Sequence, residues 1–286
     1  MTIEPPGPTQ HGGAQAVTRD LWPRLASGLA LAAVAFALLY LGRWPFALLV
    51  TAVCLAMSWE WAGMVRGRGA DPVLVVHALA VIATGALAVL GYAALGLVAA
   101  LIGTLIAGAL RFGEKARLSA LGVLYTCLPA VALLWLRGDE PLGFHAALLV
   151  ILVVSMTDIG AYFAGRLVGG PKLWPRVSPN KTWAGLIGGV GCAGLASLLF
   201  AVLVPGASPV RLALIGCGLG LVAQAGDLAE SALKRRQGVK DASALIPGHG
   251  GFMDRMDGLV TAAVVAGLIS VLTGIQSPAS ALLIGK

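Results

Sequence analysis

Charge is scarce in this chain. Only 12% of its 286 residues are Asp, Glu, Lys or Arg, whereas soluble domains carry about 25%. The hydrophobic residues make up 58% of the sequence, and the mean hydropathy is +0.88. So few charges cannot cover a surface that faces water, which excludes a soluble globular protein. Disordered chains are polar and charged, so the composition also excludes a disordered protein. The composition indicates an integral membrane protein.

Two kinds of motif are missing as well. The four cysteines each stand alone inside an apolar run, without C-x-x-C spacing; they are Cys54, Cys127, Cys192 and Cys217. This pattern argues against a disulfide framework or a thiolate metal site and predicts small, buried apolar side chains. No G-x-x-x-x-G-K-[ST] motif occurs, which argues against a P-loop ATPase.

Long apolar runs are abundant instead. A helix needs about 20 apolar residues to cross the hydrocarbon core of a bilayer. We therefore predict an all-α, polytopic membrane protein with about nine transmembrane helices, at roughly 25–42, 45–64, 72–90, 92–110, 118–136, 143–164, 184–204, 211–230 and 257–275. Residues 1–20, rich in Pro, Gly, Gln and Thr, are expected to form a flexible tail. The remainder divides into N-terminal helices (21–117) and a catalytic membrane domain (118–286).

The basic residues predict the orientation. If nine spans alternate from a cytoplasmic N-terminus, all 20 Lys and Arg face the cytoplasm except Arg43, Arg137, Arg211 and Lys286. Such asymmetry is the positive-inside pattern. The net charge of +7 is then explained by topology and by anionic lipid headgroups, and nucleic acid is not an expected partner. Two cytoplasmic segments, 165–183 and 231–256, are long and rich in Gly, Pro and charge.

Several of the 13 acidic residues fall within or at the ends of predicted spans, namely Glu60, Asp158, Asp227 and Glu230. A charge near the bilayer centre costs about 2.5–3.5 kcal/mol even on the mildest scale. For Glu60, between two tryptophans, an ion-paired or interfacial role and a functional role remain equally open. The neighbours of Asp158 and Asp227 favour function.

The segment from Asp227 to Asp257 carries the strongest pattern. Asp227, Glu230, Ser231 and Lys234 share one helical face, which could hold a metal ion and a phosphate together. Asp254 and Asp257 share the first turn of the last predicted helix. Carboxylates suit Mg²⁺, whereas a favourable helix dipole accounts for one aspartate at most. Between these carboxylates in the sequence lie Arg235, Arg236, Lys240, Asp241, His249, Gly250 and Gly251. For His249, we expect a phosphate contact or a hydrogen bond that shapes the loop rather than metal ligation.

A second segment supplies a matching set of polar groups. Asp158, Tyr162 and Gly165 share a helical face that leads to Arg166, and Ser178, Asn180, Lys181 and Thr182 precede a helix. Helix N-termini attract phosphate, although an ordinary helix cap is the alternative interpretation. Together the two segments fit phosphoryl chemistry, in which metal ions and fixed cations offset the charge of the transferred group.

Residues 231–257 closely resemble the signature of the phosphatidate cytidylyltransferase (CDP-diacylglycerol synthase) family. That signature runs S-x-x-K-R, four residues, K-D, then P-x-H-G-G and D-R-x-D, and every position is filled here. The upstream D-x-G-A-Y and S-P-x-K-T-W blocks also resemble the family, which the chain matches over roughly residues 120–275. Ala184 departs from the pattern, where a polar or acidic residue is expected.

The resemblance implies transfer of CMP from CTP to phosphatidic acid, giving CDP-diacylglycerol and pyrophosphate, with Mg²⁺ and room for a second cation. It implies metal binding by Asp227, Asp254 and Asp257, and catalytic roles for these three with Lys234, Asp241 and Arg255. The expected substrate-binding residues are Asp158, Tyr162, Ser178, Asn180, Lys181, Thr182, Ser231, Lys234, Arg235, Lys240, His249, Gly250 and Gly251. Membrane lipids and a second copy of the chain are further expected partners, in a bacterial-type inner membrane with the site facing the cytoplasm.

Two alternatives remain. A CTP-dependent lipid kinase of the polyisoprenol type is related, but the Lys-Asp, His-Gly-Gly and Asp-Arg-x-Asp elements favour the cytidylyltransferase. A transporter would place its acidic residues at the membrane centre within repeats, whereas here they cluster at one end, beside basic loops.

Overall fold

The computed structural model of the chain describes residues 28–67, 70–243, 245 and 250–285. The predicted N-terminal tail and His249 lie outside these residues. After the helix Gly28–Leu41, the elements are α2 (Arg43–Arg66), α3 (Pro72–Val89), α4 (Ala93–Ala109), α5 (Gly113–Gly138), α6 (Gly143–Leu167), β1 (Lys172–Trp174), β2 (Ser178–Thr182), α7 (Trp183–Phe200), a 3-10 turn (Ala201–Leu203), α8 (Pro209–Arg236), α9 (Met253–Gly274) and α10 (Pro278–Leu283).

The predicted all-α membrane fold is confirmed. Each predicted span coincides with a helix in the described residues, and seven of these helices are long and apolar enough to cross a membrane. Two are shorter, Gly28–Leu41 and Ala93–Ala109. The helix α8 extends to Arg236, beyond the predicted end of its span, because cations in a last turn complement the helix dipole. The connection between α8 and α9 is therefore residues 237–252.

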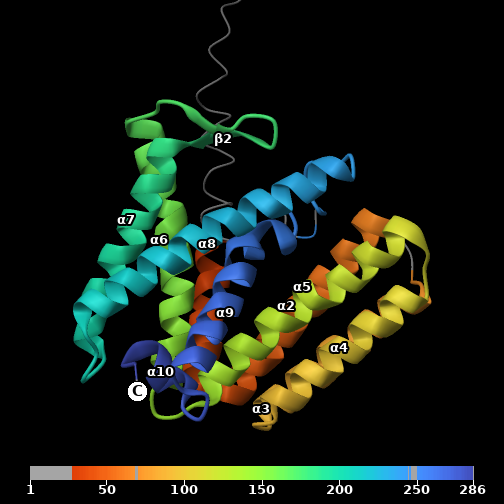
Figure 1. Ribbon diagram of the computed structural model, residues 1–286, viewed down its shortest axis with the longest axis horizontal. Helices are drawn as coiled ribbons and strands as arrows, with labels where there is room; N and C mark the ends of the chain where they lie inside the picture. Colours follow the sequence, from red (N-terminus) through yellow and green to blue (C-terminus); the bar gives the residue numbers. More distant parts are fainter. Residues whose placement is uncertain (1–27, 68–69, 244, 246–249, 286) are drawn as a thin grey trace, which may run out of the picture.

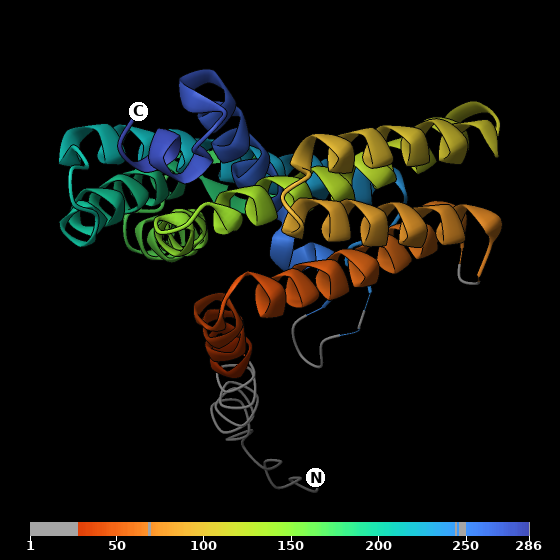
Figure 2. The same cartoon turned by 90° about the horizontal axis from the view of Figure 1, so that it is seen from below.

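The helices form two groups that meet at α5 and α9 (Figure 1). In the first group α2, α3 and α4 pack against α5. In the second, α6 packs against α7, α7 against α8 and α8 against α9. Figure 2 shows the helix Gly28–Leu41 running at a steep angle to α2, and its C-terminal half packs on the second group through ring contacts of Phe36 and Tyr40 with Phe144 of α6. The shared core is built from Ala, Val and Leu side chains.

A cluster around Asp71 joins the ends of the first group. Its carboxylate accepts a hydrogen bond from the Leu74 N–H at 2.8 Å and so caps α3, and it pairs with Arg66 at 2.9 Å and with Arg111 at 2.6 Å. Although partial burial opposes the effect, the Leu74 N–H and the two guanidinium groups hold the pKa of Asp71 below its ordinary value. These basic helix ends therefore lie on one side of the molecule.

A two-stranded antiparallel hairpin of β1 and β2 was not predicted. It links α6 to α7 (Figure 1), with Lys172 opposite Thr182 and Trp174 opposite Ser178. Gly169 and Gly170, both at positive φ, turn the chain out of α6. The Thr182 hydroxyl then accepts a hydrogen bond from the Gly185 N–H at 3.0 Å. Thr182 is therefore the N-cap of α7, as the alternative interpretation of this segment predicted.

Glycines bring α6 and α7 into close contact. A Cβ atom at Gly188 would lie 2.2 Å from the Cβ of Ala164, and one at Gly160 would lie 2.6 Å from the Cβ of Cys192. Small residues allow membrane helices to approach at the backbone. All four cysteines are free; Cys54 and Cys127 are buried as predicted, whereas Cys192 and Cys217 are half-buried because they lie on the less covered faces of α7 and α8.

The two glycines Gly188 and Gly191 on α7 provide a matched test of this contact. Gly188→Ala should lower the melting temperature in detergent by about 2–4 °C or more, because the added methyl group forces α7 away from Ala164. Gly191→Ala should leave it unchanged or raise it slightly, because nothing lies within 4 Å of that position and Ala favours helix. Equal melting temperatures for the two variants would contradict the close packing of α6 on α7.

Candidate functional site

The polar segment 158–182 and Asp227, the first residue of the other polar segment, meet in one pocket. A cavity of about 580 Å³ lies between the C-terminal end of α6, the strand β2, the start of α7 and α8. Its lining residues are Asp158, Ala161, Tyr162, Gly165, Arg166, Asn180, Lys181, Thr182, Gly185, Leu186, Gln224 and Asp227. Six of these were predicted as substrate or metal ligands, so the sequence located this pocket.

Lys181 is the cation on one side of the pocket. Its ammonium group forms an ion pair with Asp227 and donates a hydrogen bond to Oε1 of Gln224 at 3.4 Å. Ser231 in turn donates to Oδ1 of Asp227 at 3.3 Å. The side chain of Lys181 is 19% exposed and that of Asp227 is 28% exposed, so both can be reached by a polar ligand.

Four side chains form a buried row beside the pocket, which we call the charge row: Tyr125, Glu230, Lys234 and Asp254. The Tyr125 hydroxyl donates to Oε2 of Glu230 at 2.6 Å. The Lys234 ammonium lies 3.1 Å from Oε1 of Glu230 and 2.6 Å from Oδ1 of Asp254. Side-chain exposure falls to 10% at Lys234 and 1% at Glu230. The predicted polar face of α8 is confirmed, but Lys234 lies between two carboxylates.

Asp254 organises the connection between α8 and α9. Besides Lys234, its carboxylate accepts hydrogen bonds from the N–H groups of Gly251 at 2.8 Å and Ala242 at 3.1 Å. Gly250 adopts a φ of +81°, and a Cβ at Gly251 would lie 2.6 Å from Oε1 of Glu60. The two glycines therefore let the backbone approach two carboxylates.

Asp257 lies one turn further along α9, where α9 contacts α8. Its backbone carbonyl would lie 2.9 Å from a Cβ at Gly226, next to Asp227 in the chain. The negative charges of Asp227, Glu230 and Asp158 all act on the Asp257 carboxyl group. Carboxylates held together in this way repel one another, and a cation between them relieves the repulsion.

The structure does not bring the three predicted metal ligands into one group. Among the described residues, no three His, Cys, Asp or Glu side chains are close enough to hold a metal ion together, and Asp254 is engaged by Lys234 and backbone N–H groups. Mg²⁺, however, commonly takes one or two carboxylates and completes its shell with water and substrate phosphate. Asp227 and Asp257, with Asp158 nearby, fit that requirement by their chemistry.

The other predicted residues lie around this core. Arg166 donates to the Tyr162 hydroxyl at 2.8 Å, and Ser178 lies in β2 opposite Trp174, away from the pocket lining. Arg235 donates to the carbonyl of Val239 at 3.4 Å. Three more are exposed at the connection between α8 and α9 or at the start of α9: Lys240, Asp241 and Arg255.

Gln224 and Tyr125 belong to the pocket and the charge row but were not predicted from the sequence. Gln224 is 6% exposed and lies three residues before Asp227, so extending the polar face of α8 by one turn would have found it. Tyr125 lies in an apolar run of α5 with no polar neighbour at helical spacing, so its contact with Glu230 depends on tertiary packing alone.

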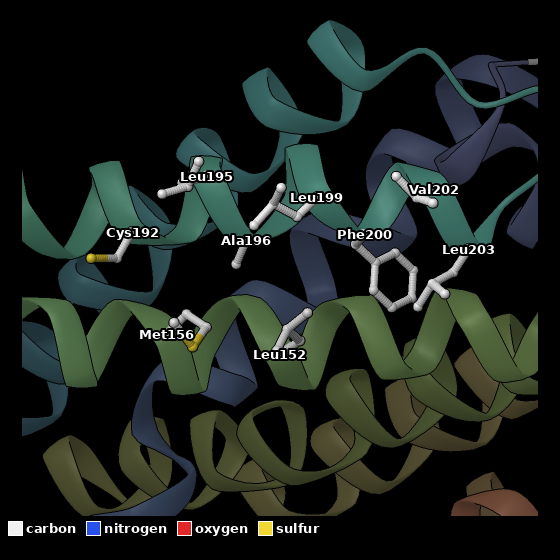
Figure 3. Close-up of a pocket in the computed structure, with 9 residues that line it drawn as sticks. All are labelled: Leu152, Met156, Cys192, Leu195, Ala196, Leu199, Phe200, Val202 and Leu203. Atoms are coloured by element: carbon white, nitrogen blue, oxygen red, sulfur yellow. The ribbon is translucent and has the colours of Figure 1, made fainter.

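A second cavity, of about 600 Å³, is purely apolar. It runs along α6 and α7 and is lined by Leu152, Met156, Cys192, Leu195, Ala196, Leu199, Phe200, Val202 and Leu203 (Figure 3). These side chains offer no group for phosphoryl chemistry, so the polar pocket is the candidate site.

Comparison with known proteins shows the family of the chain. Residues 22–272 match the model of the cytidylyltransferase family. A phosphatidate cytidylyltransferase of Brucella suis is 38% identical over 254 residues, covering 86% of this chain and 92% of that protein. One of Staphylococcus saprophyticus is 42% identical over 137 residues, covering 46% of this chain and 53% of the relative. One of Mycobacterium leprae is 44% identical over 117 residues, covering 41% and 38%. With its polar pocket, its charge row and a family match across nearly its whole length, this chain belongs to the cytidylyltransferase family.

Proposed function

We propose that the chain transfers CMP from CTP to phosphatidic acid and releases pyrophosphate and CDP-diacylglycerol. The observation that carries the proposal is a polar pocket of a membrane-embedded family member, in which residues of the upstream family blocks, around Asp158–Thr182, meet Asp227, four residues before the 231–257 signature. The name of the Brucella suis relative, similar over 86% of this chain, supports the same reaction.

The reaction needs electrostatic assistance more than acid–base chemistry. A phosphate oxygen of phosphatidic acid attacks the α-phosphorus of CTP, a new P–O bond forms, and the bond to the β-phosphate breaks with pyrophosphate leaving. The nucleophile is already ionised, so no general base is required. The obstacle is the approach of two polyanions, which fixed cations relieve. Lys181 and Arg166 are the two cations among the residues that line the pocket, and in this proposal they relieve that repulsion.

Mg²⁺ is the proposed cofactor, with Asp227 and Asp257 as its carboxylate ligands and Asp158 close to them. When bound, it would neutralise charge on the CTP phosphates as their bond breaks. In this proposal Asp254 acts through Lys234 and the backbone of the connection that it holds. Direct ligation by Asp254 and binding of a second cation stay predictions from the family resemblance.

We further propose that the pocket faces the cytoplasm, where CTP is available, in a bacterial-type inner membrane. The distribution of Lys and Arg along the chain supports this orientation. A homodimer stays a prediction from the resemblance.

A labelling assay tests the reaction directly. Membranes containing the protein are given phosphatidic acid, Mg²⁺ and CTP labelled at the α-phosphate, and the lipids are extracted. Label should enter the lipid fraction. Label that enters lipid only from the γ-phosphate would indicate a lipid kinase and contradict the proposal.

Removing the Asp227 charge should disable the reaction. Asp227→Asn eliminates the ion pair with Lys181 and one proposed metal ligand, so CMP transfer should fall about 100-fold or more, with a higher Mg²⁺ requirement. Glu114→Gln is the matched control, since it also removes one carboxylate but from an exposed site at the start of α5. A Mg²⁺ titration of Asp227→Asn that matches the unmodified protein would place the metal elsewhere.

Asp254→Asn should also remove CMP incorporation, since Lys234 loses one of its two carboxylates and the N–H groups of Ala242 and Gly251 are left with one acceptor oxygen in place of two. The protein should still insert and elute as a folded species in detergent. Near-normal turnover of this variant would exclude Asp254 from both metal binding and loop positioning.

A further inference from the structure

Glu60 lies outside the pocket, yet its carboxylate is among the most buried in the molecule. It belongs to α2, in the first group of helices, and its residue is 1% exposed. Burial of a carboxylate is costly unless hydrogen bonds replace its water. The sequence left its role open between an interfacial charge and a functional one.

The contacts of Glu60 all lie on the connection that leads into α9. Oε1 accepts hydrogen bonds from the Ser243 hydroxyl at 2.6 Å and from the Phe252 N–H at 2.9 Å. Oε2 accepts one from the Met253 N–H at 2.7 Å. Phe252 is the N-cap residue of α9 and Met253 is its first residue, and N–H groups at a helix start have no partner within the helix. A carboxylate from another helix group thus caps α9.

The backbone around Gly251 adds a steric constraint. A side chain there would lie within 2.9 Å of three atoms of the Glu60 carboxyl group, so the connection is pressed against Glu60. On its other side the Gly251 N–H donates to Asp254. Glu60 and Asp254 therefore hold the same short stretch of backbone from two directions.

This grip determines where the first turn of α9 lies. That turn carries Asp254, and Asp257 follows at the start of the next turn. The neighbouring residue Trp61 fixes α2 on the same side, since its ring N–H donates to the Leu118 carbonyl at 2.8 Å and its ring stacks near Tyr125 with centroids 5.1 Å apart. Tyr125 is the start of the charge row, so α2 supports both ends of the site.

We propose that Glu60 is a positioning residue for the reaction: by capping α9 from α2 and accepting hydrogen bonds from Ser243, Phe252 and Met253, it sets the position of Asp254 and Asp257. This inference rests on the proposed function for its catalytic consequence. Its structural part, the capping of α9, does not depend on the reaction.

The isosteric variant Glu60→Gln separates shape from acceptor chemistry. A glutamine has one oxygen, so it keeps either the Met253 contact or the two contacts of Oε1, and its NH₂ group faces an N–H donor at the other position. Because the size of the side chain is retained, the packing of α2 is preserved, while fewer hydrogen bonds hold the start of α9.

Hydrogen exchange measures the grip without any assay of activity. In Glu60→Gln, the peptide spanning residues 250–256 should exchange about tenfold faster at Phe252 and Met253, the effect of losing about one hydrogen bond. Peptides from the middle of α2 should keep their protection. Unchanged exchange at 250–256 would overturn the proposal, whatever the reaction proves to be.

Kinetics measure the catalytic consequence. In Glu60→Gln, kcat for CMP transfer should fall about tenfold or more, since small displacements of catalytic groups cost large factors in rate. The KM for phosphatidic acid should stay within about twofold, because Lys181 and Asn180 are held by the hairpin and α8. A kcat equal to that of the unmodified protein would overturn the positioning role, whereas an unmodified protein without CMP transfer would instead refute the proposed function.

Two further variants keep the test decisive. Glu114→Gln removes an equivalent charge from an exposed site and should change neither exchange at 250–256 nor kcat. Ser243→Ala removes one donor to Oε1 while both backbone contacts remain, so it should reduce kcat by less than Glu60→Gln. If Glu60→Gln does not fold, Glu60→Asp, which retains the charge but is one methylene shorter, should show the same faster exchange at 250–256; normal exchange in that variant overturns the proposal.

Discussion

Much of this structure depends on the pairing of one buried ammonium group. Lys234 is 8% exposed and lies between Glu230 and Asp254. A buried charge left without any partner is destabilising by about 3–5 kcal/mol, so Lys234 requires at least one of these carboxylates, and Glu230 requires Lys234. Because Glu230 also binds Tyr125 of α5, and Asp254 also binds the loop backbone, this pairing connects three helices and the segment between two of them. The pairing therefore holds α8, which lines the pocket, in a fixed position.

The apolar content of the sequence is sufficient to predict the helices, because a bilayer leaves backbone groups no partner outside a helix. The start of the β-hairpin between α6 and α7 was harder to foresee, since residues 172–182 offer two short strands without the alternation that identifies a sheet. Helical spacing placed Asp227, Ser231 and Lys234 on one face, and this was confirmed. Helical spacing could not reveal that Lys234 also pairs with Asp254, because that contact depends on where α9 begins.

The glycines show the same division between local and tertiary information. Gly250 and Gly251 were expected to bring the backbone close to a ligand, and close approach is indeed what they provide, but to Asp254 and Glu60. Nothing near Glu60 in the sequence points to residues almost two hundred positions later. Contacts of this range follow from the packing of α2 and α5 against α9, which a single sequence does not encode in any local pattern.

The length of α8 has a consequence for how this protein can vary. Gln224, Asp227, Glu230 and Lys234 lie on one uninterrupted rod, which serves the pocket at one level and the charge row about two turns further on. Each residue added to or removed from that stretch would rotate everything beyond it by about 100°. Insertions can accumulate in the hairpin or ahead of α2, but the interval from 224 to 234 tolerates replacement of side chains only, never a change in their number.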